Sequence, residues 1–168
     1  MIVAIVIGGA SGIGLNISNE LVRSGVKVIV ADLNGEVGQQ DNGAYFVKCD
    51  VISKESVDHK VAKTVELFGS VDILVNNAGV NLPRLLVDDK GEKTEYELSE
   101  KDFDFMVAVN QKGPYLFAQA SAKEMLKQKQ GVIINVSSEA GQEGSAGQSC
   151  YSATKVIIGI FESGCVFL

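Results

Sequence analysis

Two side chains near the end of the sequence, Tyr151 and Lys155, form a pattern that can perform acid–base chemistry. They are four residues apart, so on a helix the phenol and the ammonium lie on the same face. A nearby cation stabilises a phenolate, which lets a tyrosine with an ordinary pKa of ~10 exchange protons closer to neutral pH. Ser138, thirteen residues before the tyrosine, adds a hydroxyl that can hold a substrate oxygen. Together these groups suit the interconversion of an alcohol and a carbonyl.

Each of these residues also has a purely structural interpretation. A tyrosine can be a half-buried helix residue, a lysine a solvated charge and a serine a helix cap. Ser137 precedes Ser138, and only the thirteen-residue spacing to Tyr151 favours Ser138 as the functional one. The catalytic interpretation therefore depends on what the rest of the sequence places beside these groups.

A glycine-rich turn supplies a partner for that chemistry. The run Gly-Gly-Ala-Ser-Gly-Ile-Gly at positions 8–14 follows an apolar strand and opens a helix. Glycines permit a tight turn and close approach of the backbone to a pyrophosphate, and the helix N-terminus offers N–H donors. We therefore predict a dinucleotide site whose loop residues are Gly8, Ser11, Gly12, Ile13 and Gly14.

Asp32 ends the second predicted strand, with Leu33 beside it, and it bears on which cofactor binds. A carboxylate at this place can accept hydrogen bonds from the hydroxyls of an adenosine ribose and would repel a 2′-phosphate. Positions 31–35 contain no Arg or Lys, so NAD is favoured over NADP. The alternative is an ordinary acidic loop residue.

The elements that must position these residues alternate along the chain. Strands alternating with helices predict a doubly wound parallel sheet, Rossmann-like, in the α/β class, and we treat residues 1–168 as a single dinucleotide-binding domain. Residues 81–100 are the least regular stretch. Polar or glycine residues follow each strand and should meet at one edge of the sheet: Gly8, Asp32, Asp50, Asn76 and Ser137. The predicted strands are residues 2–7, 27–31, 44–49, 71–75 and 131–136, and the predicted helices are 12–24, 56–67 (capped by Ser53), 101–127 as one or two helices, and 152–161.

Composition excludes several classes of protein. The chain has 168 residues, of which 46% are hydrophobic and 21% charged, and its formal net charge of −6 argues against a nucleic-acid surface. His59 is the single histidine and the three cysteines show no metal-ligand spacing, so we expect no metal and free thiols in a reducing compartment. A signal peptide and a membrane span are not expected. We expect a cytoplasmic protein with a small-molecule partner, no nucleic acid and no membrane.

Several motifs in this order resemble the short-chain dehydrogenase/reductase family: the glycine turn, Asp50-Val51, Asn76-Asn77-Ala78-Gly79, Asn110, and Ser138 with Tyr151 and Lys155. The resemblance implies NAD-linked hydride transfer with Asn110, Ser138, Tyr151 and Lys155 as catalytic residues. In such a site Asn110 would hold a water that links the lysine to solvent. The resemblance also assigns cofactor-binding roles to Asp50, Val51, Asn77, Ala78, Gly79, Tyr151 and Lys155.

Further stretches resemble one branch of this family, the dehydrogenases of hexitol phosphates. They are residues 83–88, 96–98, 110–113, 131–135, 138–141, 143–145 and 147–149. The resemblance implies oxidation of sorbitol 6-phosphate to fructose 6-phosphate. Candidate substrate residues are Arg84 for the phosphate, Glu139 for the hydroxyls, and Ser138 with Tyr151 for the reacting oxygen. A surface arginine is an equally good interpretation of Arg84.

Two other functions stay open. The first is a truncated dinucleotide-binding fragment with little activity, because family members continue beyond this length and the resemblance ends near Ser163. On that view the C-terminal strands of the sheet are missing. The second is reduction of 3-oxoacyl thioesters, which usually uses NADP and is disfavoured by Asp32. By resemblance, the helices at 101–127 and 151–161 would pair with other copies in a dimer or tetramer.

Overall fold

A computed structural model describes residues 1–164 of the protein. Six strands form one sheet in the order β3-β4-β2-β1-β5-β6. All neighbours are parallel except the short β3, which is antiparallel to β4. The predicted α/β class and parallel sheet are confirmed. The strands are β1 Val3–Ile7, β2 Lys27–Asp32, β3 Gly38–Gln39, β4 Tyr45–Lys48, β5 Ile73–Asn76 and β6 Val132–Asn135.

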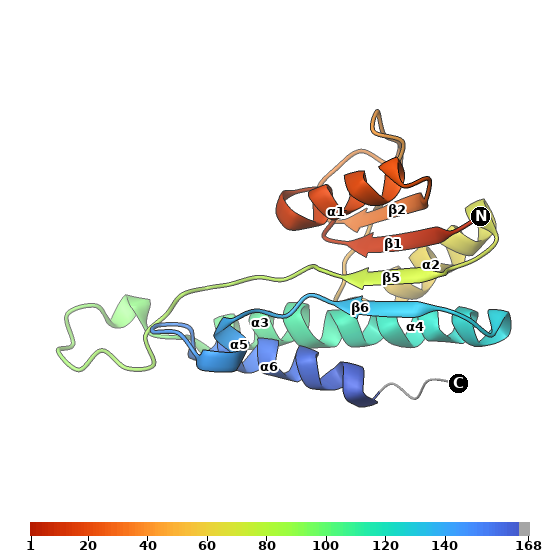
Figure 1. Ribbon diagram of the computed structural model, residues 1–168. Coiled ribbons are helices and arrows are strands. Elements are labelled where there is room, and N and C mark those ends of the chain that lie inside the picture. Colours follow the sequence, from red (N-terminus) through yellow and green to blue (C-terminus); the bar gives the residue numbers. More distant parts are fainter. Residues whose placement is uncertain (165–168) are drawn as a thin grey trace.

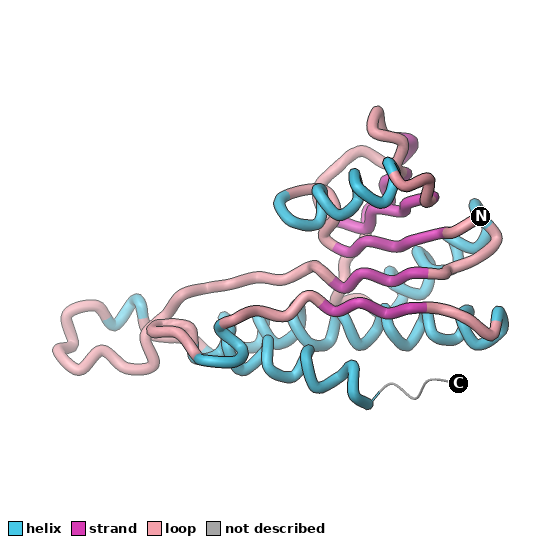
Figure 2. The backbone as a smooth tube through the Cα atoms, viewed as in Figure 1, coloured by secondary structure: helices cyan, strands magenta, loops and turns pink. Residues whose placement is uncertain are grey.

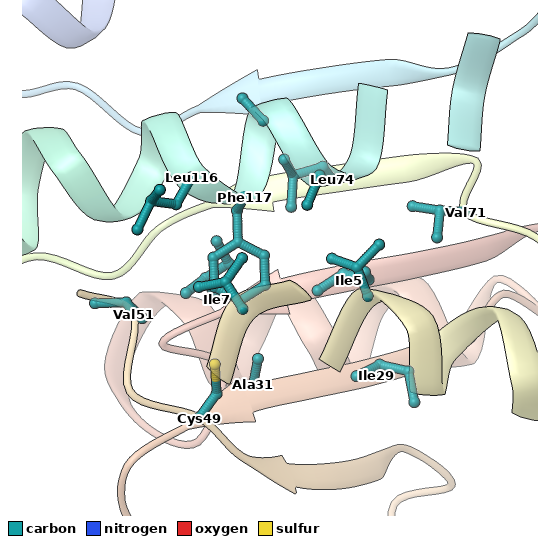
Figure 3. Close-up of a cluster of buried hydrophobic side chains, with 14 of the residues drawn as sticks. Ile5, Ile7, Ile29, Ala31, Cys49, Val51, Val71, Leu74, Leu116 and Phe117 are labelled. Atoms are coloured by element: carbon teal, nitrogen blue, oxygen red, sulfur yellow. The ribbon is translucent and has the colours of Figure 1, made fainter. Parts of the chain in front are cut away.

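Helices connect the parallel strands and cover both faces of the sheet (Figure 1). On one face, α1 packs on the sheet through an apolar cluster that includes Val6 and Val30. On the other face, α2 and α4 enclose a larger cluster in which Phe117 lies among Ile7, Leu74 and their neighbours (Figure 3). The helices are α1 Gly12–Arg23, α2 Lys54–Phe68, α3 Glu100–Val107, α4 Gly113–Gln128, α5 Ala140–Glu143 and α6 Ser149–Gly164.

The predicted helix or helices at 101–127 form one continuous helical segment. A π-helical turn, Ala108–Lys112, joins α3 to α4 and leaves Asn110 buried in the middle. Ser99 caps the start of α3 by accepting a hydrogen bond from the Asp102 N–H at 3.0 Å. Ser53 caps α2 in the same way from Ser56 at 3.2 Å, as predicted. Asn110 thus lies inside the helical segment and does not cap a helix.

Two short elements were not predicted. The strand β3 has two residues and the helix α5 has four, and neither contains an apolar run long enough to show a period. The predicted helix at 152–161 begins earlier, at Ser149, while residues 165–168 of the divergent tail lie outside the part of the chain that is described. Within residues 1–164, β6 pairs with β5 alone, and its Val132 and Ile134 side chains are about half exposed.

The carboxyl ends of the strands meet at one edge, and long loops leave from this edge (Figures 1 and 2). The longest is residues 81–98, here called the arm, which projects beyond the sheet and contains a single 3₁₀ turn, Thr94–Tyr96. Backbone hydrogen bonds from Leu85 to Tyr96 and from Leu98 to Leu85 close its base. Among residues 1–164, no helix combines the length and the apolar content that crossing a bilayer requires.

Candidate active site

The glycine turn packs backbone against backbone. A Cβ on Gly14 would lie 2.1 Å from the Gly8 carbonyl oxygen and 2.5 Å from Nδ2 of Asn77. Gly8 has a positive φ of +68°, and a Cβ there would lie 2.8 Å from the Cα of Ala78. No side chain fits at either position without movement of the main chain. The turn after β1 is thus pressed onto the segment that follows β5.

Asn77 holds these two segments together. Its Nδ2 donates to the carbonyl oxygens of Ile7 at 3.3 Å and Gly8 at 3.0 Å. The start of α1 beside them is open, because the Ser11 side chain makes no capping hydrogen bond and Ile13 is 66% exposed. The first N–H groups of a helix have no partner within the helix. This end of α1 therefore offers the donors that a pyrophosphate needs.

Asp32 lies at the mouth of the same turn. Its carboxylate accepts hydrogen bonds from the backbone N–H groups of Ala10 at 3.2 Å and Asn34 at 3.3 Å. These bonds fix a negative charge between the glycine turn and the exposed Leu33. A carboxylate held in this way can still accept further hydrogen bonds, since its two oxygens offer about four lone-pair sites. Its place agrees with the predicted ribose contact.

Asp50 and Val51 follow β4 on the same edge. The Asp50 carboxylate is exposed and accepts a hydrogen bond from the Ile52 N–H at 3.1 Å, which shapes the turn into α2. Val51 is buried and meets the helix start at Gly113, where a Cβ would lie 3.1 Å from its Cγ2. Both residues follow β4 at the sheet edge that carries the glycine turn, and their cofactor contact stays a prediction.

Tyr151 and Lys155 share one face of α6, as their spacing predicts. The Lys155 Nζ lies 5.9 Å from the centroid of the Tyr151 ring and donates a hydrogen bond to the Val136 carbonyl oxygen at 2.8 Å. Lys155 is 5% exposed, and its burial lowers the pKa of its ammonium from the ordinary value of 10.5. The ammonium is thus a buried charge held under the phenol, and it is not a solvated surface lysine.

The two adjacent serines have different partners. The Ser137 hydroxyl donates to the Lys155 carbonyl oxygen at 2.8 Å, which ties the end of β6 to α6. The Ser138 hydroxyl accepts from the Ala140 N–H at 3.3 Å, so its own proton is left for another acceptor. This difference supports the choice of Ser138, which the sequence spacing alone favoured.

Asn110 makes three hydrogen bonds from the middle of the helical segment. Its Oδ1 accepts from the Val80 N–H at 2.8 Å, and its Nδ2 donates to the Val80 carbonyl at 2.9 Å and to the Thr154 hydroxyl at 3.0 Å. Both amide protons are used, so a water held by this side chain would have to use the second lone pair of Oδ1. Gly79 precedes Val80, and a Cβ at this glycine would lie 3.3 Å from the Lys155 Nζ. The absence of a side chain at Gly79 therefore leaves space for the lysine ammonium.

The candidate substrate residues are less closely assembled. The Arg84 Nε pairs with the Asp102 carboxylate at 3.5 Å, and its backbone N–H donates to the Gly147 carbonyl at 2.7 Å. Arg84 is therefore partly engaged, and a phosphate would share it with Asp102. Glu139 is exposed beside Ser138. These contacts place the base of the arm against the loop that leads to Tyr151.

Sequence reasoning missed one polar residue of the site. Thr154 is 1% exposed and bonds to Asn110, yet its place between Tyr151 and Lys155 was interpreted only as helix. The available signal was a β-branched residue with a hydroxyl group, placed between the two predicted catalytic residues of α6. Cys49 and Cys150 are free and buried, and burial raises the pKa of both thiols. Cys165 lies outside the described residues.

Comparison with known proteins places these features in one family. The profile of the short chain dehydrogenase family matches residues 2–164. Sorbitol-6-phosphate 2-dehydrogenase of Klebsiella pneumoniae is 48% identical over 160 residues, which cover 95% of this chain and 60% of the relative. An uncharacterized oxidoreductase of Thermotoga maritima is 38% identical, covering 93% and 61%, and short-chain dehydrogenase reductase 3a of Arabidopsis thaliana is 33% identical, covering 97% and 63%.

The predicted resemblance is thereby confirmed, including its likeness to the sorbitol-6-phosphate branch. The chain spans about 60% of the length of that curated relative. The profile match extends over the glycine turn, the Asn77 segment and the Tyr151–Lys155 turn, so it includes every part of the site described above. The protein belongs to the short-chain dehydrogenase family.

Proposed function

We propose that this protein uses NAD to oxidise a secondary hydroxyl of a sugar-alcohol phosphate, with sorbitol 6-phosphate as substrate and fructose 6-phosphate as product. The observation that carries the proposal is the buried Lys155 ammonium, 5.9 Å from the Tyr151 ring centroid, at the sheet edge that also carries the glycine turn. Burying a cation costs free energy, because burial disfavours its charged form. Groups buried at such a cost are concentrated at functional sites.

The residues divide the reaction as follows. Ser138 donates its free proton to the substrate oxygen and holds it, while Tyr151 accepts the hydroxyl proton. Lys155 stabilises the phenolate by its charge. The cofactor, when bound, accepts the hydride from the carbinol carbon. The chain's own work is thus to fix the oxygen and to manage one proton.

NAD is the proposed cofactor because the Asp32 carboxylate is fixed at the ribose end of the turn by Ala10 and Asn34. A 2′-phosphate would meet this negative charge. The close packing of Gly14 on Gly8 leaves room for a pyrophosphate over the start of α1. Replacing Asp32 by asparagine should raise the affinity for NADP relative to NAD.

The substrate proposal is supported by the relative from Klebsiella and by the polar surroundings of Ser138. Residues 139–147 include Glu139, Gln142 and Glu143 and contain no large apolar side chain. Such a lining suits a polyol better than a steroid or a fatty-acyl chain. Arg84, at the base of the arm, is the proposed phosphate contact.

Association between copies is part of the proposal. Phe103, Phe105 and Tyr115 on α3 and α4 are 46%, 44% and 48% exposed, and a second copy packing on these helices would cover some of these side chains. Light scattering coupled to size exclusion should then give the mass of a dimer or a tetramer. A mass of one chain at micromolar concentration would contradict this part.

Two measurements test the function separately. Calorimetric titration should show that the chain binds NAD more tightly than NADP. NADH formation should then depend on sorbitol 6-phosphate and be weaker with unphosphorylated sorbitol. Binding without turnover on any polyol would leave a dinucleotide-binding protein and reject the proposed oxidation.

A further inference from the structure

Thr154 has a buried hydroxyl that joins two parts of the site. It accepts a hydrogen bond from the Asn110 Nδ2 at 3.0 Å and donates to the Tyr151 carbonyl oxygen at 2.7 Å. The second bond lies within α6 and is common for a threonine in a helix. The first crosses to the helical segment of α3 and α4, 44 residues away in sequence. The hydrogen bond from Asn110 is therefore not part of the hydrogen bonding within α6.

The other end of this connection reaches the lysine. Asn110 holds both the N–H and the carbonyl of Val80, at 2.8 and 2.9 Å. Gly79, the residue before Val80, lies next to the Lys155 Nζ, because a Cβ added to this glycine would lie 3.3 Å from that atom. The turn of α6 that carries Tyr151 and Lys155 is therefore linked through Thr154 and Asn110 to the backbone beside the lysine.

We propose that the Thr154 hydroxyl is a positioning group that fixes the Tyr151–Lys155 turn of α6 against the Asn110–Val80 contact. This inference rests on the proposed function, since it assigns a role within the same reaction. Removing the hydroxyl leaves a buried amide proton of Asn110 without an acceptor, and buried unsatisfied donors are costly. We expect the Asn110 side chain to rotate and its hydrogen bonds to Val80 to weaken. The Lys155 side chain then becomes more mobile. Thr154 itself does not contact the reacting atoms.

The test compares T154V, which keeps the shape, with T154S, which keeps the hydroxyl. T64V is the matched control, because Thr64 is a fully buried threonine of α2 whose hydroxyl bonds the Lys60 carbonyl at 2.8 Å in its own helix. We expect T154V to lower kcat by about tenfold or more, since small misplacements of reacting groups are costly. We expect T154S and T64V to retain kcat, and all three to retain the KM for NAD within about threefold.

Labelling of Lys155 tests the same inference without turnover. Limited acetylation with acetic anhydride, followed by mass spectrometry, reports how accessible and how basic each amine is. We expect Lys155 to be acetylated about threefold faster or more in T154V, because local opening exposes it, while T154S and T64V match the unsubstituted chain. If the unsubstituted chain shows no turnover, the proposed function fails and this measurement still decides the role of Thr154.

Circular dichroism confirms that each variant is folded, and T154A takes the place of T154V if the latter does not fold. The inference is overturned if T154V keeps full kcat, or if Lys155 is acetylated at the same rate in T154V as in the unsubstituted chain. It is also overturned if T154S is as impaired as T154V, because the methyl group and not the hydroxyl would then be responsible.

Discussion

The glycine turn and the arm lie at the same edge of the sheet, but they are built in different ways. In the turn, Gly14, Gly8 and Ala78 are in backbone contact, and Asn77 bonds across β1 and β5. In the arm, backbone hydrogen bonds join Leu85 to Tyr96 and Leu98, one more joins Arg84 to the loop before α6, and Leu86 is 78% exposed. The predicted cofactor residues are thus packed on the central strands, and we expect the arm to tolerate change without disturbing them.

This contrast separates the consequences of mutation. A change in the turn should affect stability and cofactor binding together, since the same contacts serve both. A change in the arm should affect the substrate and leave the fold intact. A change in the Tyr151–Lys155 turn of α6, the proposed catalytic turn, should reduce turnover most.

The most severe expected change is G14A. Its methyl group would overlap the Gly8 carbonyl and the Asn77 amide, so we expect loss of NAD binding and a loss of stability of roughly 3 kcal/mol, at the upper end of overpacking costs. Chemical denaturation and calorimetric titration measure the two effects. G69A is the matched control, because it adds a methyl group in open space at the end of α2 and should cost stability only. Normal NAD affinity in G14A would show that the turn is not the cofactor site.

Y151F tests the Tyr151–Lys155 turn of α6. We expect kcat to fall by about 10²–10⁴-fold, the usual range for loss of a general base, with the fold intact and NAD still bound. Y96F is the control, because Tyr96 lies in the arm and is 53% exposed. Steady-state kinetics and calorimetry give both quantities. Turnover within a few-fold of the unsubstituted chain would remove Tyr151 from the chemistry.

R84M tests the arm. We expect the KM for sorbitol 6-phosphate to rise by about tenfold, the effect of losing one charge-assisted contact, with little change for unphosphorylated sorbitol and no change in stability. K90M is the control, because Lys90 lies exposed at the far end of the arm. Equal losses on both substrates would mean that the Arg84 side chain supports the arm through Asp102 and does not bind phosphate.

The smallest expected effect is a pH dependence of stability at Lys155. Burial lowers the pKa of this lysine in the folded state below 10.5, so between the two pKa values the unfolded chain binds more protons. Stability from this group therefore rises as the pH is raised toward 10.5. We expect the free energy of unfolding of the unsubstituted chain, relative to K155M, to increase over that range.

K63M provides the opposite control. Glu66 raises the pKa of the exposed Lys63, so its small contribution to stability should fall as the pH rises. Urea denaturation at several pH values measures both differences. A difference for K155M that does not vary with pH would mean that Lys155 is not a buried charge in solution.

The same contrast explains what the sequence could predict. The glycine turn, Asp32 and the five parallel strands were predicted because their signals are local: a period of apolar residues followed by glycine or an acid. The four-residue spacing of Tyr151 and Lys155 predicted their shared face, since spacing alone determines which residues of a helix lie on one side. Ser138 was preferred on spacing, and the different partner of Ser137 supports that choice.

Other features could not be predicted because they depend on distant contacts. Asn110 meets Val80 and Thr154 at separations of 30 and 44 residues, and no local pattern indicates that its amide is used by them. The π-helical turn that buries it has no sequence period of its own. The pairing of Arg84 with Asp102 likewise appears only when the arm is placed beside α3.

The proposed function requires hydride to pass within this site from a polyol phosphate to NAD. It is tested most directly with sorbitol 6-phosphate carrying deuterium on C2, followed by mass spectrometry of the NADH formed. We predict that the chain produces NADH bearing one deuterium and that Y151F produces almost none. Formation of no NADH, or of NADH without deuterium, would contradict the account.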